Sequence, residues 1–264
     1  MSAIARLPKG GGMSTVSIGP VVVDMSATTD AVWWAADYAR RRGLPLRLVH
    51  NSSDLLAAVD PVGSVHPGVE VRQEFTTGPV VDVLVAESET AHLVVVGHRP
   101  RSAFAELVTT PVALSVSARA SCPVVAVPAG VRSFDQDHPV VVGVHDGDRV
   151  PDLLELAFAE AAGLDTGVIV VRRAPRSDDA ESDVIRAAVD EVAARHPGVR
   201  VRTELIDGSP AKGLTWHGHF GSEVVVGSHG GPRSVGRSLL RHSTIPVLLV
   251  GSHVLVPALT PDGS

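Results

Sequence analysis

The chain has 264 residues, 44% of them hydrophobic and 20% charged, which predicts a globular protein of two domains of about 130 residues. The net charge of −6 argues against a nucleic-acid-binding protein, because such proteins depend on clustered lysine and arginine. One cysteine, Cys122, excludes an internal disulfide. The N-terminus lacks the apolar segment of a signal peptide and no apolar stretch approaches the roughly 20 residues that span a bilayer, so we expect a cytoplasmic protein without membrane contact.

The first half alternates between predicted strands and helices. An apolar strand, PVVVDM from Pro20, passes through a polar turn into an alanine-rich helix that ends at Gly43. The strand LPLRLVH comes next, followed by a stub of helix at 54–59 and the strand PGVEVRQEF. A further helix leads into the buried strand AHLVVVG, and SCPVVAVP closes the half.

The second half repeats this order. Its strands are PVVVGV, GVIVVRR, PGVRVRTEL, SEVVVG and TIPVLLVG, its first helix is expected to end near Gly163, and a full helix replaces the stub. Strands that alternate with helices predict a parallel sheet covered on both faces. We therefore predict an α/β chain with tandem domains at 17–130 and 137–251, and disorder at 1–16 and 257–264.

The spacing of matching residues shows where the halves differ in length. Gly227 lies 130 residues after its counterpart Gly97, whereas Pro246 lies 123 residues after Pro123. The second half is therefore seven residues shorter between its fourth and fifth strands.

The order of these elements, with VVVG running into a turn, a helix and then CPV, resembles the universal stress protein family from about Ser17 to Val250. The resemblance implies two five-stranded parallel sheets with helices on both faces. It also implies a switch point near the first and fourth strands, where some members bind ATP. Members that bind a nucleotide carry Gly-x2-Gly-x9-Gly-[Ser/Thr] after strand four and an Asp at the end of strand one. Such glycines let backbone amides approach phosphate, and the following helix adds its positive N-terminal end.

The first half matches this motif in spacing but not in chemistry. Asp24 and Ser26 fall where the acid and a small polar residue belong, and Gly97 is the first glycine. The remaining motif positions are occupied by Pro100, Thr110 and Pro111. Two prolines remove two N–H donors, although Thr110 as N-cap and Pro111 as first helical residue still predict a helix start.

The second half departs from the motif differently. Gly227 and Gly230 match the first two glycines, but only two residues then precede Arg233 and Ser234, where the family has nine. Ser234 keeps the hydroxyl and can cap the helix, whereas the strand-one acid is either replaced by His145 or shifted one residue along. As an alternative to a triphosphate bound in the family's manner, a smaller anion or a differently posed nucleotide could be held at the helix N-terminus by His229, Arg233, Arg237 and the Ser234 hydroxyl.

The sequence leaves three functional hypotheses. No catalytic order of residues and no metal-ligand spacing recurs, so the leading hypothesis is a non-enzymatic stress-response regulator with degenerate nucleotide sites and no expected cofactor. It would act through an unknown protein partner or by self-association. The second hypothesis is a sensor that binds ATP or AMP in the first half, and the third is an adenylyl-transfer enzyme. The last strands are apolar edges, and the resemblance implies that they meet each other or the same strands of a second chain.

Overall fold

The computed structural model describes residues 19–25, 28–50, 68–98, 111–133, 137–145, 149–174, 180–228 and 234–254, without the side chains of 180–182. The predicted stub helix at 54–59 and the predicted disordered ends lie outside these residues. The first half contains β1 (Val21–Asp24), α1 (Thr29–Arg42), β2 (Leu46–His50), β3 (Val71–Phe75), α3 (Val80–Glu87), β4 (Leu93–His98), α4 (Val112–Ser117) and β5 (Val124–Pro128). The second contains β6 (Val140–Val144), α5 (Val150–Leu164), β7 (Val168–Arg173), α6 (Ala180–Arg195), β8 (Val201–Ile206), α7 (Pro210–Gly218), β9 (Glu223–Gly227), α8 (Val235–His242) and β10 (Val247–Val250).

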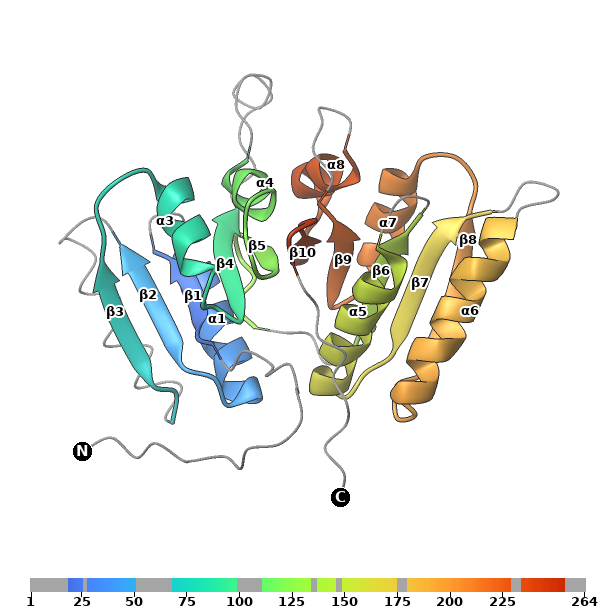
Figure 1. Ribbon diagram of the computed structural model, residues 1–264, viewed down its shortest axis with the longest axis horizontal. Helices are drawn as coiled ribbons and strands as arrows, with labels where there is room; N and C mark the ends of the chain where they lie inside the picture. The colour runs from blue at the N-terminus through green and yellow to red at the C-terminus, as the bar shows by residue number, and fades with distance from the viewer. Residues whose placement is uncertain are drawn as a thin grey trace, which may run out of the picture.

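All ten strands form one sheet in the order β3-β2-β1-β4-β5-β10-β9-β6-β7-β8 (Figure 1). Neighbours within each half are parallel, and the single antiparallel pair is β5 with β10 at the centre. Val125 lies opposite Leu248, and each is the second residue of its strand. The halves are therefore related by an approximate two-fold axis that passes between these two residues. This is the first of the two arrangements expected for the last strands.

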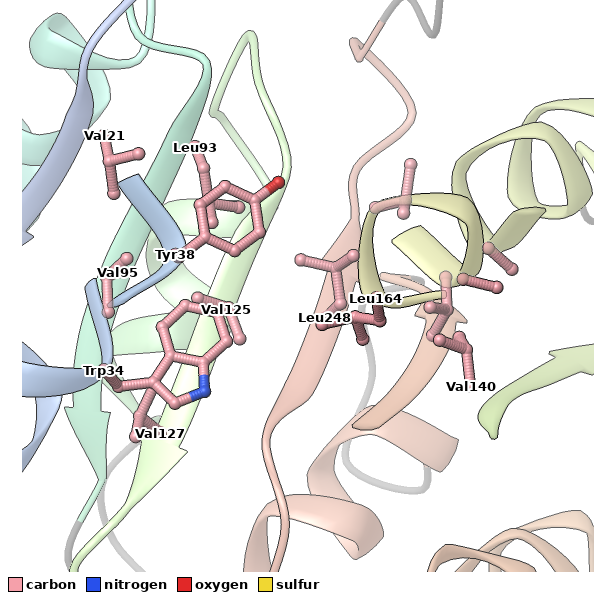
Figure 2. Close-up of a cluster of buried hydrophobic side chains, with 14 of the residues drawn as sticks. Val21, Trp34, Tyr38, Leu93, Val95, Val125, Val127, Val140, Leu164 and Leu248 are labelled. Carbon is pink, nitrogen blue, oxygen red and sulfur yellow. The ribbon is translucent and has the colours of Figure 1, made fainter. Parts of the chain in front are cut away.

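Runs of valine explain why the central strands form. All residues of β1, β5, β6 and β10 are buried, as expected of strands with helices on both faces. One core packs under α1, α5 and α6, and the other packs under α3, α4, α7 and α8. Each core contains residues from both halves, so the two repeats share their packing. Figure 2 shows Val125 of the first core beside Trp34 and Tyr38, and Leu248 across the junction beside Leu164.

The helix ends test several expectations. Gly43 ends α1 in the left-handed conformation at φ 62°, and the Ser234 side chain caps α8, which confirms both predictions. The prediction that α5 ends near Gly163 is also confirmed, since the helix runs one residue past it to Leu164 and Asp165 takes the left-handed position at φ 55°. A Cβ atom at Gly163 would lie 2.7 Å from Cζ of Arg42, so this glycine makes room for the other half. Pro111 is the N-cap of α4 and not its first helical residue.

Candidate functional site: the two switch-point edges

Each half has a topological switch point at the carboxyl ends of two neighbouring parallel strands. In the first half the chain runs from β1 outward to β2, while β4 leads the other way to β5. In the second half β6 and β9 have the same relationship. Ligands of open α/β sheets bind in the crevice at such a point, so these two edges are the candidate sites.

The structure brings Asp24 and Gly97 to the same edge. Val23 of β1 lies opposite Val95 of β4, which places Asp24 one residue below the level of Gly97 on the neighbouring strand. Asp24 is 4% exposed. Gly97 is opposite Val127, and β4 continues in register past it to His98, so the backbone beside the glycine belongs to the sheet. Ser26 lies outside the described residues.

The start of α1 at this edge is already neutralised by the chain itself. Thr28 Oγ1 accepts a hydrogen bond from the Ala31 amide at 3.3 Å. Asp30, in the first turn, accepts from the Gly130 amide at 2.9 Å and from Arg132 Nε at 2.6 Å. The positive end of the helix therefore faces a carboxylate of this chain, and the segment after β5 is tied over it.

In the second half Gly143 occupies the position of Asp24. Val21 and Val140 are the first paired residues of β1 and β6, so the fourth strand position is Asp24 in one half and Gly143 in the other. The interpretation of His145 as the replacement was wrong, since it lies two residues farther on. A Cβ atom at Gly143 would lie 2.6 Å from Leu214 Cδ1, so no acid fits there unless Leu214 moves.

The turn after β9 is also drawn into the sheet. Gly227 pairs with Val250, and the amide of Ser228 donates to the Val250 carbonyl at 2.7 Å. The first amide beyond the glycine is therefore occupied by β10 and does not face a ligand. The hydroxyl of Ser228 lies 2.6 Å from that of Ser117 in α4, which links the two halves at this edge.

The strand register confirms the shortened loop. Gly97 and Val127 are opposite one another and thirty residues apart, whereas Gly227 and Val250 are opposite and twenty-three apart. Ser234 Oγ accepts from the Arg237 amide at 3.2 Å and so serves its own helix. Gly230 and Arg233 lie outside the described residues, and the predicted small-anion site stays a prediction.

Two other chemistries find no support in the described part of the chain. Within it, no group of three or more histidine, cysteine, aspartate or glutamate residues is placed to hold a metal ion. Cys122 is 6% exposed, and burial raises the pKa of its thiol to about 12, so it stays protonated at neutral pH. A buried neutral thiol is a packing residue and a poor nucleophile.

Sequence reasoning missed a buried polar cluster between the halves. Tyr38 on α1 donates its hydroxyl to Glu160 Oε1 on α5 at 2.9 Å. Arg42 Nη2 donates to Glu160 Oε2 at 2.6 Å, and its guanidinium lies 5.3 Å from the centre of the Tyr38 ring. Glu223 at the start of β9 is buried close to this pair. We call Tyr38, Arg42, Glu160 and Glu223 the junction cluster; in Figure 2 the Tyr38 hydroxyl points from α1 toward the second half.

Burial governs the charges of the junction cluster. It raises the pKa of Tyr38 well above 10, and Glu160 adds to the effect. Burial alone would lower the pKa of Arg42, but Glu160 and Tyr38 more than offset it and the pKa is raised. One signal in the sequence could have found the cluster, because aligned halves place Glu223 where the first half has the buried Leu93.

Comparison with known proteins shows what the chain is similar to. The model of the universal stress protein family matches residues 52–128. A universal stress protein from Mycobacterium tuberculosis is 27% identical over 87% of this chain and 95% of its own length. One from Mycolicibacterium smegmatis is 25% identical with the same coverage. Over most of its length the chain is therefore similar to universal stress proteins.

Solved structures agree with this fold. The crystal structure of a universal stress protein from Archaeoglobus fulgidus aligns with a TM-score of 0.68 at 16% identity, covering 89% of this chain and 97% of that one. The cytoplasmic domain of a prokaryotic cation chloride cotransporter aligns with a TM-score of 0.62 at 12% identity, covering 91% and 98%. In the described part of this chain, no helix has the length and apolar character to cross a membrane.

Proposed function

We propose that this chain is a universal stress protein, and that it is a non-enzymatic stress-response regulator whose switch-point edges do not bind a nucleoside triphosphate. The observation that carries the proposal is that glycine stands where the first half has Asp24, and that Leu214 leaves no room for a side chain at Gly143. The hydrogen bond from the Ser228 amide to the Val250 carbonyl of β10 supports the proposal further.

The regulator would act through contacts with another protein or with a second copy of itself. The fold serves as the cytoplasmic domain of a cotransporter in one structural relative, which supports a role inside a larger assembly. Within the described chain β5 and β10 each have a strand on both sides, so self-association would use a surface other than these strands. Size-exclusion chromatography with light scattering, over a range of concentrations, tests self-association directly.

A second candidate is a sensor that binds ATP or AMP in the first half. Asp24 favours it, because this acid is retained at the end of β1 on the same edge as Gly97. An adenylyl-transfer enzyme ranks below both, since the described residues offer no catalytic arrangement.

Calorimetric titration with ATP and with AMP separates the two candidates. The regulator predicts no binding heat and no change in melting temperature. A sensor predicts binding that is lost in Asp24→Ala, and at a hundredfold excess over Kd its ligand adds about 2.7 kcal/mol of stability. Asp82→Ala is a matched control, because Asp82 is an exposed residue of α3 whose partner is the exposed Arg119. Binding retained by the control and lost in Asp24→Ala replaces the first candidate with the second.

A further inference from the structure

The junction between the halves contains a carboxyl group with one buried oxygen that lacks a hydrogen bond among the described residues. Glu223 is the first residue of β9 and is 1% exposed. Among the described residues, no donor lies within hydrogen-bonding distance of its Oε1 atom. An ionised carboxylate in such a place would be strongly unfavourable unless it were paired and hydrogen-bonded.

The charged groups that face Glu223 come from both halves. Arg42 and Tyr38 face it from α1, and Glu160 faces it from α5. On the strand side, β6 presents Val140 directly opposite Glu223, and the residue before β10 is Pro246, neither of which titrates. His92 also faces the cluster, with its Nε2 atom 3.3 Å from the Tyr38 oxygen.

The charges of the junction cluster balance only when one carboxyl is protonated. Arg42 carries one positive charge, and Glu160 already pairs with it at 2.6 Å. The Tyr38 hydroxyl also donates to Glu160, so both oxygens of that carboxylate accept hydrogen bonds. In the described chain, Oε1 of Glu223 has neither an arginine partner nor a hydroxyl donor, so the proton of the cluster belongs on Glu223.

We propose that Glu223 is a proton-binding site at the junction, and that its bound proton stabilises the packing of α1 of the first half against α5 and β9 of the second. The internal repeat supports this assignment. Leu93 holds the same place in β4, opposite Val21, as Glu223 holds in β9, opposite Val140. A protonated glutamate is an uncharged side chain that fits where the other half has leucine.

The pKa of Glu223 shifts in the direction that this proposal requires. Burial raises it well above its usual 4.5, Glu160 raises it further, and Arg42 opposes the shift. The unfolded chain therefore releases this proton at a lower pH than the folded chain does. It follows that the contribution of the Glu223 proton to the free energy of unfolding is complete below about pH 4.5. This contribution falls as the pH rises, until Glu223 ionises in the folded protein as well.

Urea unfolding across the range from about pH 5 to pH 8 measures this linkage. Between the two pKa values, Glu223 is protonated in the folded chain and ionised in the unfolded chain. In this range the group raises the unfolding constant of the natural chain about tenfold per pH unit. In Glu223→Gln and Glu223→Leu this pH dependence of the unfolding constant should be absent, whereas the exposed control Glu89→Gln should keep it. The histidines contribute the same background to every variant. An unchanged slope in Glu223→Gln overturns the proposal.

Infrared difference spectroscopy provides a direct readout in the folded protein. At about pH 6 the natural chain and Glu89→Gln should show the carbonyl stretch of a protonated carboxyl group, and Glu223→Gln should lack it. Ordinary glutamates are ionised at this pH, so the band reports a carboxyl with a raised pKa. A natural chain without the band, or a band that survives in Glu223→Gln, refutes the assignment.

Discussion

Tyr38 and Glu160 occupy the same position of equivalent helices and hydrogen-bond to one another. Each lies five residues before the left-handed C-cap of its helix, Gly43 in α1 and Asp165 in α5. The bond of 2.9 Å joins the two halves above the central pair of strands. One half thus supplies a donor, and the other supplies an acceptor from the equivalent site.

Removing the donor tests how much this bond contributes. Tyr38→Phe leaves Glu160 Oε1 buried without its partner, so we expect the free energy of unfolding to fall by about 1–3 kcal/mol in urea titration. Ser115→Ala is the control, because it deletes a local hydroxyl bond of 3.4 Å to the Pro111 carbonyl, and it should stay within about 0.5 kcal/mol. Equal losses in the two variants contradict the prediction.

Tyr38 is the single tyrosine of the chain, so its ionisation can be followed without interference. Its pKa is raised well above 10, first by burial and then by the negative Glu160. The phenol should therefore stay protonated in the folded protein as the pH passes 10, when an exposed tyrosine ionises. Stability should fall above this pH, because only the unfolded chain releases the proton. Ultraviolet absorbance measures the ionisation of the phenol. If Tyr38 titrates near pH 10 while the fold is intact, the prediction is wrong.

Restoring the acid of the second half should destabilise it. In Gly143→Asp the new Cβ atom meets Leu214 Cδ1 at 2.6 Å, and overpacking of this kind costs about 1–3 kcal/mol. Leu214→Ala in the same chain should recover part of that loss, although each change alone is destabilising. Gly198→Ala is the control, since no atom lies within 4 Å of its added Cβ. The measurement is the thermal unfolding of the natural chain, Gly143→Asp, the double variant and Gly198→Ala. An unchanged melting temperature in Gly143→Asp would mean that the site has room for an acid.

The outer strands of the sheet carry charges that should keep chains apart. Arg72 and Glu74 lie on β3, and Arg202 and Glu204 lie at the same places on β8. Charged side chains on an edge strand oppose pairing with another sheet. Replacing all four with threonine should produce concentration-dependent association in light scattering. Arg186→Ala, on the exposed face of α6, should remain unchanged, and a monodisperse quadruple variant contradicts the prediction.

Local signals were sufficient to predict most of the fold. The structure confirms the valine-rich strands, the glycine after α1 and the serine before α8. Each of these signals depends only on residues close to it in the sequence. The comparison of Gly97 with Gly227 predicted a shorter second loop, which the strand register confirms. The pairing of β5 with β10 was one of two expected arrangements, because an apolar edge strand requires a partner but does not identify it.

The junction could not be predicted in the same way. Tyr38 and Glu160 are 122 residues apart, and each lies in an alanine-rich helix where a single polar residue usually faces solvent. Gly163 suggested a nearby helix end, but it is also needed for the approach of Arg42, which is a contact between halves. Gly143 was overlooked as the counterpart of Asp24 because His145 is the more conspicuous polar residue, and only the strand register settles the equivalence.

The antiparallel seam between β5 and β10 joins two copies of one architecture within a single chain. In an assembly of identical chains, any residue near the symmetry axis must face its own duplicate, so two glutamates would confront each other there. A duplicated gene product escapes that restriction, because the copies can accumulate different substitutions. The tyrosine of one repeat could thus become complementary to the glutamate of the other, and such an asymmetric contact fixes which repeat meets which.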